Sequence, residues 1–169
     1  MKGVRDTDRG YRKVITNIGI LDHDITVGVH ADEGAAVHRD GGGMTIAEIA
    51  EAHEFGIPEG AGPTDQDPSA ILPERSFIRS WVDQDGGEFL NEISHQCNAV
   101  AAGKKTAPVA AKQLAVRAEG QVKKRMIRGE ITPKLSEATI AARIDNSAIP
   151  LVDSGQLVAS VQGRAEPVK

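Results

Sequence analysis

The sequence predicts an α+β fold, in which a small antiparallel β-sheet packs with a long helical hairpin and shorter helices. Two observations lead to this class. Residues 25–30 alternate apolar side chains with small or polar ones, which is the period-two pattern of a half-buried strand. The stretches 75–100 and 104–128 instead repeat apolar residues every three or four positions, as amphipathic helices do.

Length and composition favour one domain. The 169 residues suit a flexible N-terminal arm at 1–13 followed by a single α+β domain at 14–169. The single cysteine, Cys97, excludes an intrachain disulfide, and we interpret it as a core residue because it lies on the apolar stripe of its helix. The sequence shows no signal peptide and no stretch of about 20 apolar residues, so we expect a soluble protein made inside a cell.

The first helix has a recognisable start and stop. Thr45 and Glu48 have the spacing of a capping box, and Gly56 provides a stop after Phe55. The segment that follows, 57–72, is rich in Pro and Gly and predicts a long loop.

Two long helices come next. The apolar stripe at 78–100 is interrupted by Gly86-Gly87, which marks a site for a kink. A second helix follows a short turn and stops at Gly129, so we expect an antiparallel hairpin. Thr132-Pro133 then predicts a shorter helix, with the threonine as cap and the proline at the first helical position.

The stretch 150–157 reads PLVDSGQL and has two interpretations, a nucleophilic Ser154 on a tight turn or a helix cap. No histidine follows Ser154, and the Gly-x-Ser-x-Gly pattern is absent, so the cap is favoured. We expect Asp153 to be the cap residue, Gln156 to be its partner, and a preceding apolar residue to pack on Leu157.

The net charge of −4 conceals an asymmetry. Between Asp32 and Glu92 there are 14 acidic and 3 basic residues, whereas 104–128 holds 8 basic residues and 1 acidic residue. Opposite charge blocks favour contact between copies of the chain, or contact of one face with nucleic acid, and the alternative is ordinary solvated faces. The candidate residues for a charge-mediated interface or channel contact are Lys112, Arg117, Lys123, Lys124, Arg125 and Arg128.

Other chemistry is weakly indicated. The spacings of the histidines match no metal-ligand pattern, and the glycines at 41–43 precede a helix without a phosphate-binding lysine. No set of acid, base, nucleophile and metal ligands converges in the sequence. We therefore expect no catalytic residues, no metal and no cofactor, and a protein that is not an enzyme.

Three motifs in a fixed order resemble the tail-completion or neck proteins of long-tailed bacteriophages, a family of head–tail joining proteins also described as minor tail components. The matching positions are Glu54, Phe55, Gly56, then Pro73, Arg75, Phe77, Arg79, then Pro150, Leu151, Asp153, Ser154, Gly155 and Leu157. The resemblance covers roughly residues 25 to 161. The loop at 57–72 is longer than in that family, and little sequence follows Val161, so we expect a small sheet.

The resemblance implies a structural virion protein, located in the neck or at the head-proximal end of the tail and assembled in the host bacterial cytoplasm. It implies a homo-oligomeric ring, commonly a hexamer, around the channel for genomic DNA. The implied partners are further copies of itself, neck proteins on the portal or adaptor side, and the tail terminator or tail tube, with no membrane. Two alternatives stay open: a tail terminator that caps the tube, and a small DNA-binding protein that uses 104–128.

Overall fold

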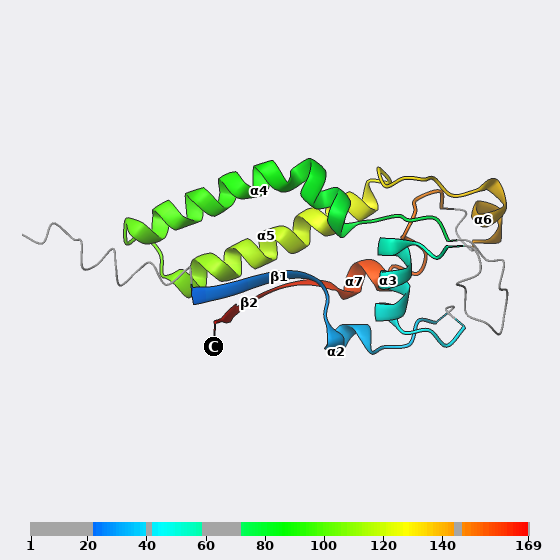
Figure 1. The fold of residues 1–169 in the computed structure, drawn as a ribbon, viewed down its shortest axis with the longest axis horizontal. Helices are drawn as coiled ribbons and strands as arrows, with labels where there is room; N and C mark the ends of the chain where they lie inside the picture. Colours follow the sequence, from blue (N-terminus) through cyan, green and yellow to red (C-terminus); the bar gives the residue numbers. More distant parts are fainter. Residues whose placement is uncertain (1–21, 40–41, 59–71, 144–146, 169) are drawn as a thin grey trace, which may run out of the picture.

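Two long antiparallel helices and a two-stranded sheet form the body of the described part of the molecule (Figure 1). The structure is a computed structural model that describes residues 22–39, 42–58, 72–143 and 147–168. In chain order the elements are β1 His23–Val29, α2 Ala31–Gly34, α3 Ile46–Phe55, α4 Ile78–Ala101, α5 Ala107–Ile127, α6 Glu137–Ala142, α7 Gln156–Ser160 and β2 Val161–Pro167. The predicted α+β class is confirmed. The predicted arm at 1–13 and most of the predicted loop at 57–72 lie outside the described residues.

The sheet joins segments from the two ends of the described chain. β1 and β2 run antiparallel, from Val29 opposite Val161 to His23 opposite Pro167. Alternate residues of β1 are partly buried, and Val27 packs against the main core. The predicted strand and the predicted small sheet are therefore confirmed.

Helix α5 is the middle layer, with the sheet on one side and α4 on the other (Figure 1). Its buried face consists largely of alanines, which allow neighbouring backbones to approach closely because they present only a methyl group. These alanines are Ala107, Ala110, Ala111, Ala115 and Ala118.

Strand β2 makes its closest approach to α5 at Gly163. A Cβ atom built there would lie 1.9 Å from the carbonyl oxygen of Ala115, so no side chain fits. The Gly163 amide donates to Glu119 Oε2 at 3.1 Å, and Glu119 lies one helical turn after Ala115. Lys123 Nζ hydrogen-bonds the other oxygen of this carboxylate, and the two bonds hold the pKa of Glu119 below its usual value.

Helix α4 continues without a break through Gly86-Gly87, and Figure 1 shows it changing direction near its N-terminal end. The Trp81 indole meets the Phe89 ring edge-on at 5.3 Å and donates through Nε1 to Gln121 Oε1 at 3.3 Å. The hydrogen bond to Gln121 joins α4 to α5, the ring contact lies within α4, and Trp81 itself belongs to the main core.

The predicted helix start at Thr132-Pro133 is wrong, because α6 begins four residues later. The Pro133 carbonyl accepts a hydrogen bond from Arg75 Nε at 2.8 Å. In a helix that began at Pro133, this carbonyl would instead accept from a backbone amide of the same helix. Ser136 is the cap instead, and its hydroxyl accepts from the Thr139 amide at 3.1 Å.

The close contact between β2 and α5 predicts the effect of a single methyl group. Gly163→Ala is expected to lower the free energy of unfolding by about 3 kcal/mol, because the new Cβ forces two backbones apart. Gly120→Ala is the matched control: its Cβ meets open space on the helix surface, so it is expected to raise stability by about 1 kcal/mol. Urea unfolding measures both, and equal effects of the two substitutions would contradict the packing described.

Candidate functional site

The first two motifs meet where α3 ends and α4 begins. The Glu54 carboxylate accepts hydrogen bonds from the Phe77 amide at 2.8 Å, the Ile78 amide at 3.1 Å and the Arg79 amide at 3.0 Å. It also accepts from the Ser76 hydroxyl at 2.6 Å. The first amides of α4 have no partner within their own helix, so a carboxylate from α3 satisfies them and complements the positive end of the helix dipole.

Arg75 links the same junction to the segment before α6. Its side chain is only 7% exposed and donates to the carbonyls of Pro133 at 2.8 Å and Lys134 at 3.4 Å. Its amide donates to the His53 carbonyl at the end of α3. Burial, together with the nearby Arg143 charge, holds the pKa of Arg75 below its usual value. Arg75 therefore ties three separate stretches of chain together.

The remaining residues of these motifs divide between the core and the surface. Phe77 is 2% exposed and belongs to the main core. Phe55 is 64% exposed, and the Arg79 guanidinium lies 5.8 Å from the centre of its ring. Arg79 also pairs with Glu74 at 2.7 Å.

Gly56 and Pro73 shape the turn between these segments. Gly56 has a φ of 73°, and an added Cβ would lie 2.9 Å from the Glu74 amide nitrogen and the Leu72 carbonyl oxygen. Pro73, half-buried, lies between those two residues. Both residues therefore belong to the turn that brings α3 and α4 together.

The C-terminal motif packs its leucines inside. Leu151 and Leu157 are both buried in the main core, and Pro150 is fully buried. The predicted Asp153 cap is wrong: Gly155, with a φ of 76°, precedes α7 and no side chain caps the helix. Asp153 instead pairs with Arg143, whose Nε lies 4.0 Å from its Oδ1.

A contact that sequence reasoning missed joins this motif to the segment before α3. Ser154 Oγ lies 3.3 Å from His38 Nε2 and 3.3 Å from Gln156 Oε1, and the Gln156 side chain also accepts from the Arg39 amide at 3.1 Å. Ser154 and His38 are separated by 116 positions, so no local pattern indicates the pair. Ser154 is exposed, and its hydroxyl bridges two segments that approach only in the folded chain.

A cavity of about 290 Å³ lies between α3 and the C-terminal motif. Its walls are mainly apolar and include Ile49, Leu151 and Leu157. His53 lines it, and its Nδ1 is buried with no hydrogen-bond partner in the described part of the chain. Burial, and then the charges of Arg75 and Arg143, lower the pKa of His53 to about 4, so this imidazole is neutral near pH 7.

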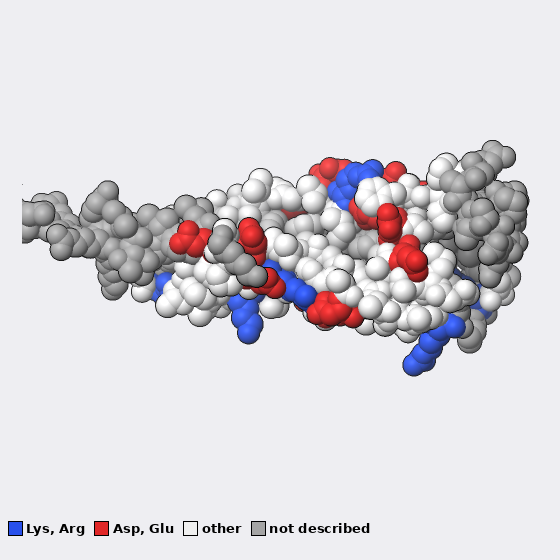
Figure 2. All heavy atoms as spheres, turned by 60° about the horizontal axis from the view of Figure 1, so that its bottom comes forward, with Lys and Arg blue, Asp and Glu red and all other residues white. Residues whose placement is uncertain are grey.

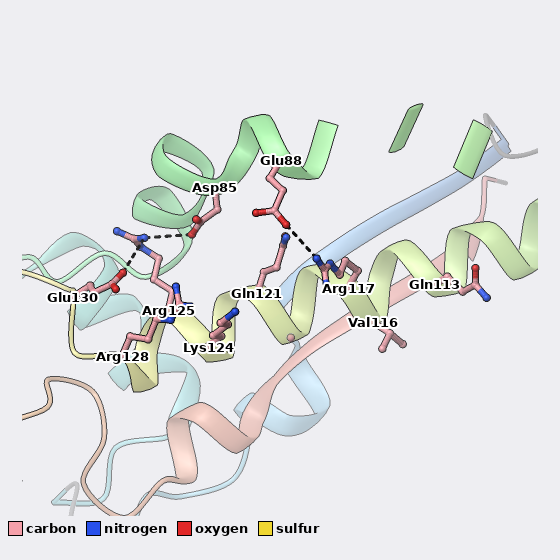
Figure 3. A pocket seen from close by; sticks show the side chains of 11 residues that line it. Asp85, Glu88, Gln113, Val116, Arg117, Gln121, Lys124, Arg125, Arg128 and Glu130 are labelled. Carbon is pink, nitrogen blue, oxygen red and sulfur yellow. Dashed lines mark hydrogen bonds and ion pairs between the residues drawn. The ribbon is translucent and has the colours of Figure 1, made fainter. Parts of the chain in front are cut away.

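Two cations of the basic helix are paired with carboxylates of α4 inside the subunit (Figure 3). Arg125 is 4% exposed, pairs with Asp85 of α4 at 3.3 Å and with Glu130 at 3.8 Å, and donates to Ser80 Oγ at 3.0 Å. Arg117 pairs with Glu88 of α4 at 3.1 Å. Two residues of the acidic block, Asp85 and Glu88, therefore meet the basic helix within one chain.

The other candidate cations differ in their surroundings. Lys123 pairs with Glu119 at 2.7 Å, within α5. Lys112, Lys124 and Arg128 are exposed, and none of them has an ion pair with another residue of the described ranges. Lys124 and Arg128 line a groove of about 470 Å³ between α4 and α5, together with Arg117 and Arg125 (Figure 3).

The described ranges contain neither a metal-binding cluster nor a membrane-spanning helix. No cluster of three or more His, Cys, Asp or Glu side chains is arranged to bind a metal ion there. None of the helices in these ranges is both long and apolar enough to cross a membrane. Cys97 is half-buried and packs against the smaller apolar cluster, beside Val100 and Leu114.

The Glu54 carboxylate gives a second prediction. Glu54→Ala is expected to lower the free energy of unfolding by about 2 to 3 kcal/mol, because three helix amides and a hydroxyl lose a charged acceptor. Glu51→Ala, on the exposed face of the same helix, should change stability by less than about 0.5 kcal/mol. Denaturant unfolding monitored by circular dichroism compares them, and a small loss for Glu54→Ala would show that α4 starts without this cap.

His53 predicts a pH dependence of stability. Its pKa is about 4 in the folded chain against 6.5 in the unfolded chain, so the unfolded state binds the proton more tightly. The stability present above pH 6.5 is therefore lost as the pH falls towards 4, by about 3 kcal/mol at most. His53→Gln, which does not titrate, should flatten this part of the profile. Parallel profiles for the two proteins between pH 7 and about 4.5 would contradict the assignment.

Comparison of the chain with protein-family models, curated proteins and solved structures found no match.

Proposed function

We propose that this chain is a structural subunit of a tailed bacteriophage particle, a tail-completion or neck protein that forms a ring around the DNA channel at the head–tail junction. The observation that supports the proposal most strongly is the spatial convergence of its three motifs. Glu54 and Arg75 organise the start of α4, while Leu151 and Leu157 pack into the core that α3 and α4 share.

The contacts of the motif residues are those of an architectural unit. Glu54 caps a helix, Arg75 binds two carbonyls, and Phe77 fills the core. These residues satisfy one another inside the subunit, and a ligand is not required for any of them to be paired. A family that retains such residues would retain a subunit shape, which is what a ring component requires.

The sheet supports assembly with neighbouring copies. It has only two strands in the described ranges, so each strand has one edge whose backbone groups lack a strand partner there. Two-stranded sheets are marginally stable by themselves, and association with neighbouring copies covers such edges. A closed cyclic assembly gives every copy the same environment, which favours a ring over an open chain.

The DNA-binding alternative is less well supported. A helix that binds duplex DNA must present its cations to phosphates, but Arg117 and Arg125 are paired with carboxylates of α4 and Lys123 with Glu119. The basic helix contains no aromatic residue that could stack on bases. Non-specific proximity to DNA inside a ring places weaker demands on the same residues.

Two substitutions in the C-terminal motif test the architectural interpretation in phage particles. Leu157→Asp buries a carboxylate in the core and is expected to abolish folding and incorporation into virions. Ser154→Ala removes an exposed hydroxyl and should leave infectivity within about twofold of the parent phage. Plaque assays and immunoblots of purified virions measure both, and loss of infectivity in a folded, incorporated Ser154→Ala protein would favour catalysis by Ser154.

The ring itself is tested by electron microscopy of the purified protein and of particles labelled with an antibody to it. Rings, and label at the head–tail junction, are expected. A protein that stays monomeric and is absent from particles would overturn the proposal.

A further inference from the structure

The α4–α5 groove retains positive charge after the internal ion pairs are counted. Three carboxylates line it, Asp85, Glu88 and Glu130, and they are engaged by Arg125 and Arg117. Lys124 and Arg128 remain on the same wall, one helical turn apart along α5, without an ion pair in the described ranges (Figure 3). The groove therefore presents two unpaired cations to whatever enters it.

The same wall also has an apolar part. Val116 lines the groove and is 59% exposed, and Gly120 lies one turn further along α5 with open space above it. An apolar side chain beside a pair of cations favours an occupant that combines carboxylates with a small apolar group.

The free end of the sheet has that chemistry. Asp24 lies directly opposite Glu166, and both are exposed. Like charges in this position destabilise a sheet, and neither carboxylate has an ion pair or side-chain hydrogen bond within the described residues. Exposed Asp22 lies two positions before Asp24, and Val168, two positions after Glu166, is 53% exposed.

Among the described residues, a cation on the same face of β2 is already paired elsewhere. Arg164, on the same face of β2, pairs with Asp32 and Glu33 beyond the other end of β1. The hydrogen bond from Arg164 also lowers the pKa of Asp32. Acidic side chains are correspondingly visible on the side of the molecule that carries the sheet (Figure 2).

The acidic end of the sheet and the unpaired cations cannot meet within one molecule. The free end of the sheet lies beside the start of α5, whereas Lys124 and Arg128 lie at the end of α5 (Figure 1). The helix between them has 21 residues and is about 30 Å long. Only a second copy brings the two surfaces together.

We propose that the acidic end of the sheet of one copy, formed by Asp22, Asp24 and Glu166, docks into the α4–α5 groove of a second copy. Lys124 and Arg128 are the counter-charges, and Val168 contacts Val116. The contact joins two different surfaces, so it repeats from copy to copy and generates a ring or a filament. This contact would be the interface between subunits of the proposed ring. It rests on the proposed function only in requiring that the repeated contacts close into a ring.

Charge exchange tests the interface. One variant carries Asp24→Lys and Glu166→Lys, a second carries Lys124→Glu and Arg128→Glu, and a third carries all four substitutions. Sedimentation velocity at about 50 mM salt should show self-association of the parent protein that weakens as salt is added. Each of the first two variants should associate at least about tenfold more weakly.

Restored pairing is the decisive result. The fourfold variant should associate like the parent protein, and the first two variants should associate when mixed, because opposite charges then face each other again. Glu51→Lys with Glu137→Lys is the matched control for the first variant, since it makes the same change in net charge at exposed residues away from both surfaces. All five proteins are first compared by circular dichroism to establish that they fold.

Three results would overturn the interface: a parent protein that is monomeric at about 100 μM, first and second variants that associate as the parent does, or a fourfold variant that fails to recover. Loss of duplex DNA binding in the Lys124→Glu and Arg128→Glu variant, with association unchanged, would assign the groove to nucleic acid instead. Rings and virion incorporation that persist in both variants would overturn this contact alone. Their absence in the parent protein would overturn the proposed function.

Discussion

A single carboxylate determines how the helical hairpin begins. Glu54 lies in the last turn of α3 and binds three amides at the start of α4, so the direction in which α4 leaves the junction depends on where α3 stops. The N-terminus of α3 is fixed in turn by the reciprocal Thr45–Glu48 capping box, and the hydrogen bonds from Thr45 lower the pKa of Glu48. Because α4 carries Trp81 and half of the groove, the position of both follows from that one side chain.

Local patterns predicted the elements that local interactions stabilise. The Thr45–Glu48 box, the alternating strand and the two apolar stripes were read directly from spacing, and the structure confirms them. The two misplaced caps show where this reasoning stops. Pro133 and Asp153 have the right chemistry at the right spacing, but arginines outside the local capping pattern, Arg75 and Arg143, interact with their oxygen atoms. A sequence window contains no information about such partners.

The candidate site was predictable as a set of residues and not as an arrangement. The sequence indicates the motif positions, yet the Glu54 cap joins residues 23 to 25 positions apart, and the Ser154–His38 contact spans 116 positions. Charge counts indicated a basic helix correctly but not its partners, because pairing with Asp85 and Glu88 depends on the alignment of α4 against α5. The buried, unpaired Nδ1 of His53 likewise depends on packing alone.

Because Gly163 has no side chain, it also determines the register of β2 against β1 and α5. A shift of β2 by one residue would place Gln162 or Arg164 against the carbonyl of Ala115, where not even a methyl group fits, and would turn every side chain of β2 to the opposite face. A two-stranded sheet with few cross-strand constraints is prone to such slippage. Here Gly163 fixes the register, because no other residue of β2 fits at its position. Strand β2 should therefore tolerate changes of side chain at many positions but not the insertion or deletion of a single residue.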